Sequence, residues 1–235
     1  MTVETRYLDG TYLAHNPEWD CSDAPWKAAR VAEILKRNGI SPTSICDVGC
    51  GSGHILAELR GQFPDARLYG FDISPQLRDV WRKHAALGID LRVGNFLEST
   101  ERYDVLTMLD VFEHVRDPFS FLEAARGRAR HFVFHIPLDL SALSVARGTP
   151  LMQQRRNVGH LHFYTKDLAL ETLQDCGYST IEWCYTEAYA SLVTHRTWKT
   201  RLAHMPRRLL ASINRDAAAR LLGGETLIVL ATART

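Results

Sequence analysis

The stretch ICDVGCGSGH, residues 45–54, decides the fold class of this chain. It starts inside the apolar run SICDV (44–48), which is typical of a buried strand, and a helix is expected from His54 to Leu59. Glycine lets the backbone turn sharply between two such elements and approach a ligand closely, because no Cβ intervenes. In open α/β sheets a turn of this kind lies at the carboxyl edge of the strands, where ligands bind.

The spacing of the glycines separates two kinds of ligand. A dinucleotide fingerprint requires G-x-G-x-x-G, but the position three residues after Gly51 is His54. The glycines run instead as Gly49, Gly51 and Gly53, so we expect a ligand without a pyrophosphate. A tight turn that binds nothing is the plainer interpretation, and two later segments argue against it.

The first of these segments is RLYGFD (67–72), a predicted strand that ends in an acidic residue. Asp72 lies 23 residues after Gly49, and an acidic side chain about 20 residues after such a loop can accept both ribose hydroxyls. The alternative is that Asp72 caps the helix predicted over 74–88, although Ser74 as N-cap followed by Pro75 suits that role better.

The second segment is Gly94-Asn95-Phe96, which follows the predicted strand 91–93. The amide of Asn95 is suited to an adenine edge, while Phe96 or Ile73 would pack on the adenine face. An ordinary turn is the alternative interpretation.

Short apolar runs alternate with amphipathic segments along the chain, which is the pattern of βαβ units. We therefore expect an α/β fold with a Rossmann-like, seven-stranded, mostly parallel sheet, helices on both faces and one antiparallel strand. The predicted strands cover 44–48, 67–72, 91–93, 103–109, 130–137, 178–186 and 225–233, and the predicted helices cover 25–38, 54–59, 74–88, 119–129 and 165–177.

A single domain is expected over residues 1–235. It divides into an N-terminal cover segment (1–40), a cofactor-binding core (41–137), an insertion or lid (138–164) and a C-terminal part on the substrate side (165–235).

The composition is that of a globular protein. The 235 residues are 46% hydrophobic and 23% charged, and the net charge of +1 gives no argument for nucleic-acid binding. No run of about 18 apolar residues predicts a membrane span, and the N-terminus does not resemble a secretory signal. Five cysteines without a C-x-x-C pair favour reduced thiols over disulfides or zinc, so we expect a cytoplasmic protein.

Together these segments resemble the class I S-adenosylmethionine-dependent methyltransferases. ICDVGCGSGHIL is similar to the family's first motif, YGFDIS to the second, YDVLTMLDVFEHVRDP to the fourth, and VGNF to the third, in which Asn95 stands where Asp is commoner. The run GHLHFYTKDLALETLQDCGY resembles the late segment of the small-molecule branch, which includes ubiquinone-biosynthesis O-methyltransferases and natural-product enzymes. The resemblance covers roughly residues 25–185 and implies S-adenosyl-L-methionine as the cofactor.

The resemblance also implies roles for individual positions. It places the loop against the methionine part of the cofactor, Asp72 on the ribose, and a group of apolar and amide side chains on the adenine. The implied cofactor-binding residues are Asp47, Gly49, Cys50, Gly51, Gly53, Asp72, Ile73, Asn95, Phe96 and Leu109, the last through its backbone.

The N-terminal run YLAHNPEWDCSDAPWKAA resembles the cover helix that such enzymes place over the cofactor. There Lys27 would pair with the methionine carboxylate, and Tyr12, Trp19 or Trp26 would close the site. A surface lysine with packed aromatic rings is the alternative.

Four histidines, His114, His135, His160 and His162, are candidates for a general base, because histidine titrates near neutral pH. His114 follows the fourth strand, close to the reactive end of the cofactor, and the alternative role is a structural hydrogen bond. His135 lies inside a predicted strand, which favours a satisfied core histidine. His160, in Gly-His-Leu-His162 before a helix capped by Thr165, would form a wall of the acceptor site.

Asp110, Glu113 and His114 together resemble a divalent-metal site. Three such groups within five residues more often cap a helix or pair with Arg116, and we predict no functional metal.

Residues 190–222 form a basic amphipathic segment. They contain Arg196, Lys199, Arg201, Arg207, Arg208, Arg215 and Arg220 against Asp216 alone, a net charge of +6. Such a segment can contact an anionic lipid or a phosphorylated substrate, although a solvated helix face is the plainer alternative.

The function expected from these features is methyl transfer to oxygen or nitrogen of a small or carrier-linked acceptor. Three rivals remain: an RNA-modifying methyltransferase, a non-catalytic subunit that binds the same cofactor, and a nucleotide-dependent oxidoreductase. His54 in the glycine loop disfavours the oxidoreductase, and Leu109-Asp110-Val111-Phe112 departs from the N/D-P-P-aromatic run of enzymes that methylate base nitrogens.

Overall fold

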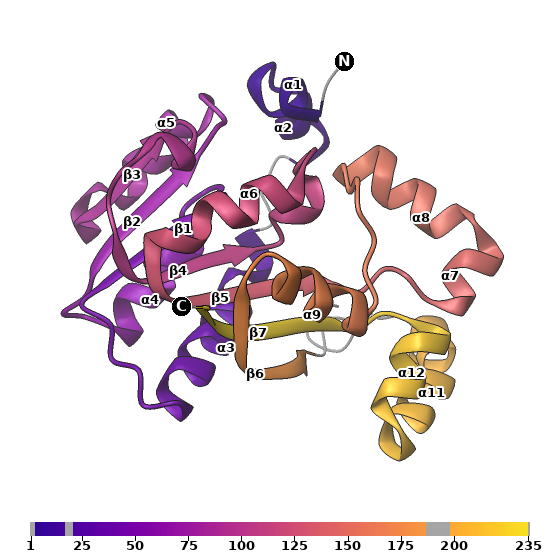
Figure 1. The fold of residues 1–235 in the computed structure, drawn as a ribbon. Coiled ribbons are helices and arrows are strands. Elements are labelled where there is room, and N and C mark those ends of the chain that lie inside the picture. Colours follow the sequence, from indigo (N-terminus) through magenta and orange to yellow (C-terminus); the bar gives the residue numbers. More distant parts are fainter. Residues whose placement is uncertain (1–2, 17–20, 187–197, 235) are drawn as a thin grey trace.

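A seven-stranded sheet forms the centre of the molecule in the computed structural model, which describes residues 3–16, 21–186 and 198–234. The strand order is β3-β2-β1-β4-β5-β7-β6, and Figure 1 shows the strands side by side across the molecule. The strands are β1 (Ser44–Val48), β2 (Arg67–Asp72), β3 (Ile89–Val93), β4 (Tyr103–Leu109), β5 (Ala129–Pro137), β6 (Tyr178–Thr186) and β7 (Thr226–Ala233).

β7 is antiparallel to both of its neighbours, β5 and β6, and the other neighbouring strands pair in parallel. The predicted fold class is therefore confirmed, with β7 as the antiparallel strand. The strand order reverses between β1 and β4, so the carboxyl ends of these two strands flank the crevice where doubly wound sheets bind ligands.

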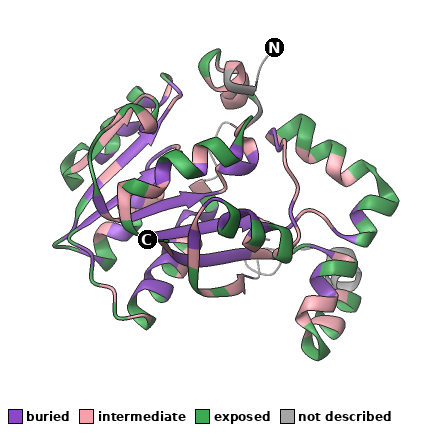
Figure 2. Cartoon of the chain, viewed as in Figure 1, coloured by how far each residue is buried: buried purple, intermediate pink, exposed green. Residues whose placement is uncertain are grey.

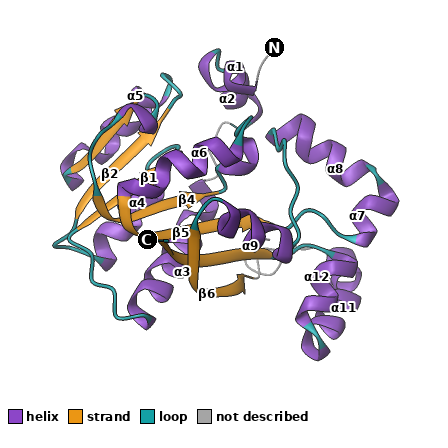
Figure 3. Cartoon of the chain, viewed as in Figure 1, coloured by secondary structure: helices purple, strands orange, loops and turns teal. Residues whose placement is uncertain are grey.

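Helices cover both faces of the sheet (Figure 3). The helices are α1 (Val3–Leu8), α2 (Thr11–His15), α3 (Ala24–Arg37), α4 (His54–Gln62), α5 (Leu77–Trp81), α6 (Pro118–Ala125), α7 (Ala142–Arg147), α8 (Thr149–Gln153), α9 (Lys166–Asp175), α11 (Trp198–Ile213) and α12 (Arg215–Leu222).

Each face of the sheet has its own hydrophobic core. Val31 and Leu35 of α3 pack with Leu56 and Leu59 of α4 on one face. Leu122 of α6 and Leu173 of α9 belong to the core on the other face. The central strands are buried on both sides (Figure 2) and therefore read as continuous apolar runs, as expected for a parallel sheet covered by helices.

The segment predicted as one helix over 74–88 is different in the structure. α5 starts only after Gln76 and gives way to a 3₁₀ helix, Arg82–Leu87. The expected cap at Ser74 is wrong, because the Ser74 N–H donates to Asp72 and the cap of α5 makes no side-chain hydrogen bond. Trp81 and His84 hydrogen-bond to the backbone of the glycine loop, which fixes this segment to β1 rather than leaving it a free surface helix.

The insertion 138–164 is helical rather than irregular. It holds α7, α8 and a π-helical turn, Gln154–Val158, and lies at the same end of the molecule as α11 and α12 (Figure 1). Its tip contacts the N-terminal segment, where Arg6 donates a hydrogen bond of 2.8 Å to the carbonyl of Arg156.

Among the helices of the described ranges, none combines the length and the apolar character needed to cross a bilayer. All five cysteines are free thiols.

Candidate cofactor and acceptor site

The loop between β1 and α4 uses a backbone conformation that favours glycine. Gly49, Gly51 and Gly53 have φ of 70°, 49° and 78°. A Cβ added at Gly49 would lie 2.9 Å from Cγ2 of Val111, so the loop also approaches the end of β4 too closely for a side chain. The glycines are therefore required both by the turn and by the packing.

Asp72 ties the end of β2 to this loop. One carboxylate oxygen accepts a hydrogen bond of 3.0 Å from the Gly51 N–H, and the other accepts one of 2.9 Å from the Ser74 N–H. Burial raises the pKa of Asp72. Each oxygen has a further lone pair, which is the acceptor that a ribose hydroxyl needs.

A cavity of about 870 Å³ opens at the carboxyl ends of β1 and β4. This volume lies in the upper part of the range of about 300–1,000 Å³ that is usual for ligand pockets. Its walls bring together most of the predicted cofactor residues, and those lining it are Lys27, Gly49, Cys50, Gly51, Asp72, Ile73, Asn95, Phe96 and Leu109.

Asn95 has a second role that the sequence did not predict. Its side chain caps the 3₁₀ helix Phe96–Glu98 by accepting a hydrogen bond of 3.0 Å from the Leu97 N–H. Asn95 also lines the cavity, so the cap leaves it beside the predicted cofactor site. Its contact with adenine remains a prediction.

Asp47 lies behind the loop, buried in β1. Its carboxylate accepts a hydrogen bond of 2.6 Å from the hydroxyl of Thr107 on β4. Burial raises the pKa of Asp47 to about 7. The position agrees with the predicted supporting role, and neither Asp47 nor Gly53 is part of the described cavity wall.

Lys27 of α3 joins two carboxylates at the cavity wall. Its ammonium lies 2.7 Å from Asp23 and 2.7 Å from Asp110. Burial acts to lower the pKa of Lys27, but the two carboxylates raise it above its usual range. Asp110 follows β4 with a φ of 56°, a strained conformation for a residue other than glycine.

His135 is a core residue, as the sequence favoured. It is 3% exposed, donates to Asp110 at 2.6 Å and contacts the Thr226 hydroxyl at 2.9 Å with its other nitrogen. Trp26 packs its ring edge-on against His135, at 5.6 Å between centroids. Within the described residues Trp26 is not part of the cavity wall, so the structure does not place it over the cofactor.

His114 and His160 lie together, with ring centroids 4.8 Å apart. His114 lines the cavity, and its burial lowers its pKa to about 4. His160 stands behind it and hydrogen-bonds to Asp139 at 2.6 Å. No residue of the insertion 138–164 lines the cavity, and its His160 packs against His114. A role of this segment as a lid stays a prediction.

Residues of the N-terminal segment contribute to the cavity wall, and a cover over the cofactor stays a prediction. Tyr7, Leu8 and Tyr12 from α1 and α2 line it. Burial raises the pKa of Tyr7. Trp19 lies outside the described residues.

The basic segment is partly neutralised within the molecule. Arg215 pairs with Glu225, Arg220 pairs with Asp167, and Arg207 donates to the Leu222 carbonyl. Arg208 is exposed. Arg196 and the side chains of Lys199 and Arg201 lie outside what the structure describes.

Two features of the site could not be read from the sequence. Asp110, Glu113 and His114 do not gather as one group, because Asp110 turns to Lys27 and His135. His160 takes its place beside Glu113 and His114. The Gly-His-Leu-His pattern was the only sequence signal for this arrangement.

Class I S-adenosylmethionine-dependent methyltransferases combine this strand order with a glycine loop of this spacing and a carboxylate at the end of β2, and the molecule is one of them. The residues present fit the cofactor, since the loop excludes side chains and Asp72 keeps acceptor capacity toward the cavity. The chain belongs to the methyltransferase-domain family, whose model matches residues 24–182.

Curated relatives agree with this assignment. The ubiquinone biosynthesis O-methyltransferase of Actinobacillus pleuropneumoniae is 35% identical over 103 residues, which are 39% of this chain and 43% of the relative. That of Xanthomonas oryzae is 30% identical over 130 residues, 50% of this chain and 53% of the relative. The matched part of the chain thus spans about half or less of the length of these relatives.

Solved structures share the fold. A Haloferax volcanii methyltransferase, in complex with a methyltransferase activator, superposes with a TM-score of 0.66 at 18% identity, covering 99% of this chain and 98% of that one. Magnesium protoporphyrin IX methyltransferase from Synechocystis, with bound SAH, gives 0.60 at 17% identity, covering 90% and 83%.

Proposed function

We propose that this chain methylates a hydroxyl oxygen of a small or carrier-linked metabolite. The observation that carries the proposal is a single cavity that reaches from Asp72, at the cofactor end, to His114 at the other. The matched relatives are named O-methyltransferases, which supports oxygen over nitrogen as the acceptor atom.

The chain's own residues would hold the cofactor along the cavity wall. Asp72 would accept the ribose hydroxyls, and Phe96 would pack against the adenine. Lys27 would face the methionine carboxylate, while its partner Asp110 would accept a hydrogen bond from the methionine amino group. When bound, S-adenosylmethionine supplies a methyl group on a sulfonium, a donor that needs no further activation.

The remaining task of the protein is to position the acceptor and to exclude water. Positioning alone can lower a barrier by about 7–11 kcal/mol at best. Tyr7 and Tyr12 would close the cavity over the reactants. The unprotonated ring of His114 would accept a hydrogen bond from the acceptor hydroxyl and so align its oxygen.

Methyl transfer to a defined panel of acceptors tests the proposal. Ortho-diphenols with and without a prenyl tail would be compared with matched amines, using methyl-labelled cofactor and mass spectrometry of the products. We expect methyl ethers from the diphenols, and a loss of at least 100-fold in kcat for His114→Asn with cofactor affinity retained. Methylation of the amines alone, or cofactor binding without any transfer, would contradict the proposal.

We also propose that α11 and α12 contact an anionic lipid surface. Met205, Leu209 and Ile213 recur every four residues along α11 and are exposed, Ile213 by 83%. Arg208 lies among them, which gives a face with apolar and cationic groups together. This face would suit an acceptor that is carried by a lipid.

A further inference from the structure

Glu113 is buried beside the cavity in a state that needs an explanation. Its side chain is 0% exposed, and neither carboxylate oxygen has a hydrogen-bond partner. A carboxylate is costly to bury unless it is paired or coordinates a metal. Among the described residues, none donates a hydrogen bond to this carboxylate, so a bound ion would supply the missing partner.

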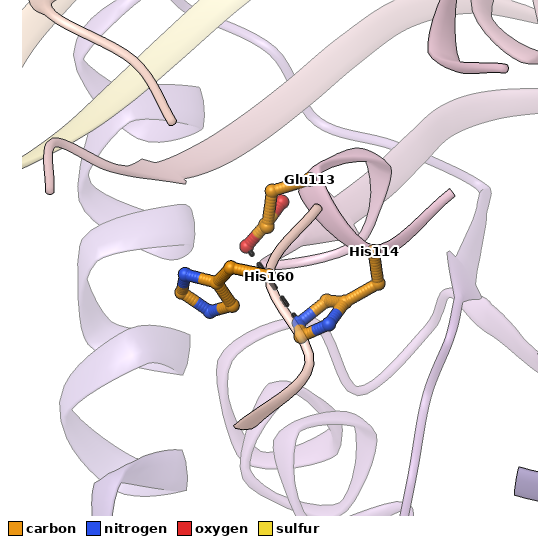
Figure 4. A group of neighbouring side chains, drawn as sticks. All are labelled: Glu113, His114 and His160. Carbon is orange, nitrogen blue, oxygen red and sulfur yellow. Dashed lines mark ion pairs between the residues drawn. The ribbon is translucent and has the colours of Figure 1, made fainter. Parts of the chain in front are cut away.

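Two imidazoles face this carboxylate. One ligand atom each of Glu113, His114 and His160 lies within 4.8 Å of the others, and Figure 4 shows the three side chains directed into a common space. The Glu113 Oε1 to His114 Nε2 distance is 4.0 Å. This is too long for a hydrogen bond. It also exceeds the roughly 3.4 Å that separates two ligand atoms of a tetrahedral zinc-type ion, so the two side chains would approach each other when an ion binds.

The backbone holds the two chain segments together at this point. The carbonyl of Glu113 accepts hydrogen bonds from the N–H groups of Leu161, at 2.8 Å, and His162, at 3.2 Å. The His162 ring also contacts the Val115 carbonyl, at 3.0 Å. His160 is thus held beside Glu113 by the hydrogen bonds of its neighbours Leu161 and His162.

Asp139 completes the pattern of a built metal site. Its carboxylate accepts from Nδ1 of His160 at 2.6 Å, which leaves Nε2 of that ring as the nitrogen for a ligand. Metal-binding histidines commonly donate their second nitrogen to a carboxylate in this way, which fixes the tautomer and the ring orientation.

We propose that Glu113, His114 and His160 bind a divalent ion of the zinc type. Two imidazoles and one carboxylate are a recurrent ligand set for such ions and leave coordination positions open. His114 lines the cavity, whereas Glu113 and His160 are not part of its wall, so the ion would lie at the edge of the acceptor end.

The ion would act on the acceptor at the same site, and this role rests on the proposed function. An acceptor hydroxyl bound to the ion would lose its proton to solvent more readily, leaving an oxygen nucleophile close to the cofactor. Coordination would replace the direct hydrogen bond from the hydroxyl to His114.

Metal binding is tested without cofactor or acceptor. The chain is stripped with a chelator and titrated with Co²⁺, whose visible absorption reports nitrogen ligands, and with Zn²⁺ in thermal unfolding. We expect one Co²⁺ per chain and a rise in Tm with Zn²⁺. Glu113→Gln and His160→Asn should weaken Co²⁺ binding at least tenfold and remove most of the rise in Tm with Zn²⁺. The control is His131→Asn on β5, away from the three proposed ligands, and it should change neither.

Circular dichroism and cofactor binding of the metal-free variants establish that they are folded. Wild-type protein that binds no ion, or variants at Glu113 and His160 that bind as tightly as wild type, would overturn the proposal. Binding that is lost in both variants would support it even if no methyl ether forms, an outcome that would reject only the proposed function. Undiminished methylation by the metal-free wild type would overturn the role of the ion.

Discussion

Asp72 has two partners on the protein and, by proposal, two more on the cofactor. We expect Asp72→Ala to weaken S-adenosylmethionine binding at least tenfold, about 1.4 kcal/mol, because both the ribose acceptor and the bond to the Gly51 N–H are lost. Calorimetric titration measures this directly. Asp79→Ala is the matched control, since Asp79 is an exposed carboxylate on α5. Equal affinities for the two variants would remove Asp72 from the ribose site.

Asp47 predicts a pH dependence of stability. The pKa of the folded state, about 7, lies above the ordinary value of 3.8, so the folded state binds the proton more tightly than the unfolded state. Stability from this group is therefore greatest below about pH 4 and falls as the pH rises to about 7, by up to about 1.4 kcal/mol per pH unit.

Asp47→Asn removes this titration and keeps an oxygen that can accept from Thr107. We expect the variant to gain Tm over wild type at pH 8 and to gain much less at pH 5, measured without cofactor. A Tm difference that does not change between the two pH values would mean that Asp47 is charged at no cost in the folded state.

Among single residues, the sequence predicted those that belong to short local motifs. Gly49, Gly51 and Asp72 line the cavity as expected, because local turn geometry and strand ends determine their positions. The contacts of Asp110 with Lys27 and His135 could not be predicted from the sequence, because tertiary packing brings together a helix, a strand end and a neighbouring strand.

Among the elements, the loop between β1 and α4 offers a paired test of backbone conformation. Gly49→Ala would impose a side chain at φ 70° and meet Val111 at 2.9 Å, so we expect a loss of stability of about 1–2 kcal/mol or more and weaker cofactor binding. Thermal unfolding and calorimetry measure the two effects.

Gly61→Ala is the control within α4. No atom outside its own helix and chain neighbours lies within 4 Å of the added Cβ. Gly61 is in the last turn of α4, and a helical glycine destabilises relative to alanine, so this variant should gain up to about 0.5–1 kcal/mol. If both variants lost the same stability, the glycine loop would have no special conformational requirement.

Strands were predicted better than helices. β1, β2 and β4 agree with the predicted bounds residue for residue, since a run that is buried on both faces is a strong signal. The bounds of β6 also agree, although this strand is partly exposed. The helix expected over 74–88 is short because Trp81 and His84 bond to the loop after β1, a tertiary effect that helical periodicity does not contain. The helices of the insertion, such as the six-residue α7, are too short for an apolar periodicity to predict them.

For the whole molecule, α11 and α12 predict binding to anionic vesicles. We expect co-sedimentation with vesicles containing phosphatidylglycerol at low ionic strength and release by salt, because the contact combines exposed apolar side chains with cations. Leu209→Ser with Ile213→Ser should reduce it. Ile181→Ser, on exposed β6, is the control, and sedimentation unaffected by either change, or absent in wild type, would exclude this face as a lipid contact.

β7 occupies the slot between β5 and β6, although it follows β6 by about 40 residues. During synthesis β6 therefore has no strand to pair with until residues 226–233 have left the ribosome, a delay of about 2–8 s at ordinary elongation rates. Throughout this interval β5 presents an open edge, which is a template for intermolecular pairing. The nascent chain would depend on chaperones at this stage, and a premature stop before β7 would yield an aggregating product rather than a smaller enzyme.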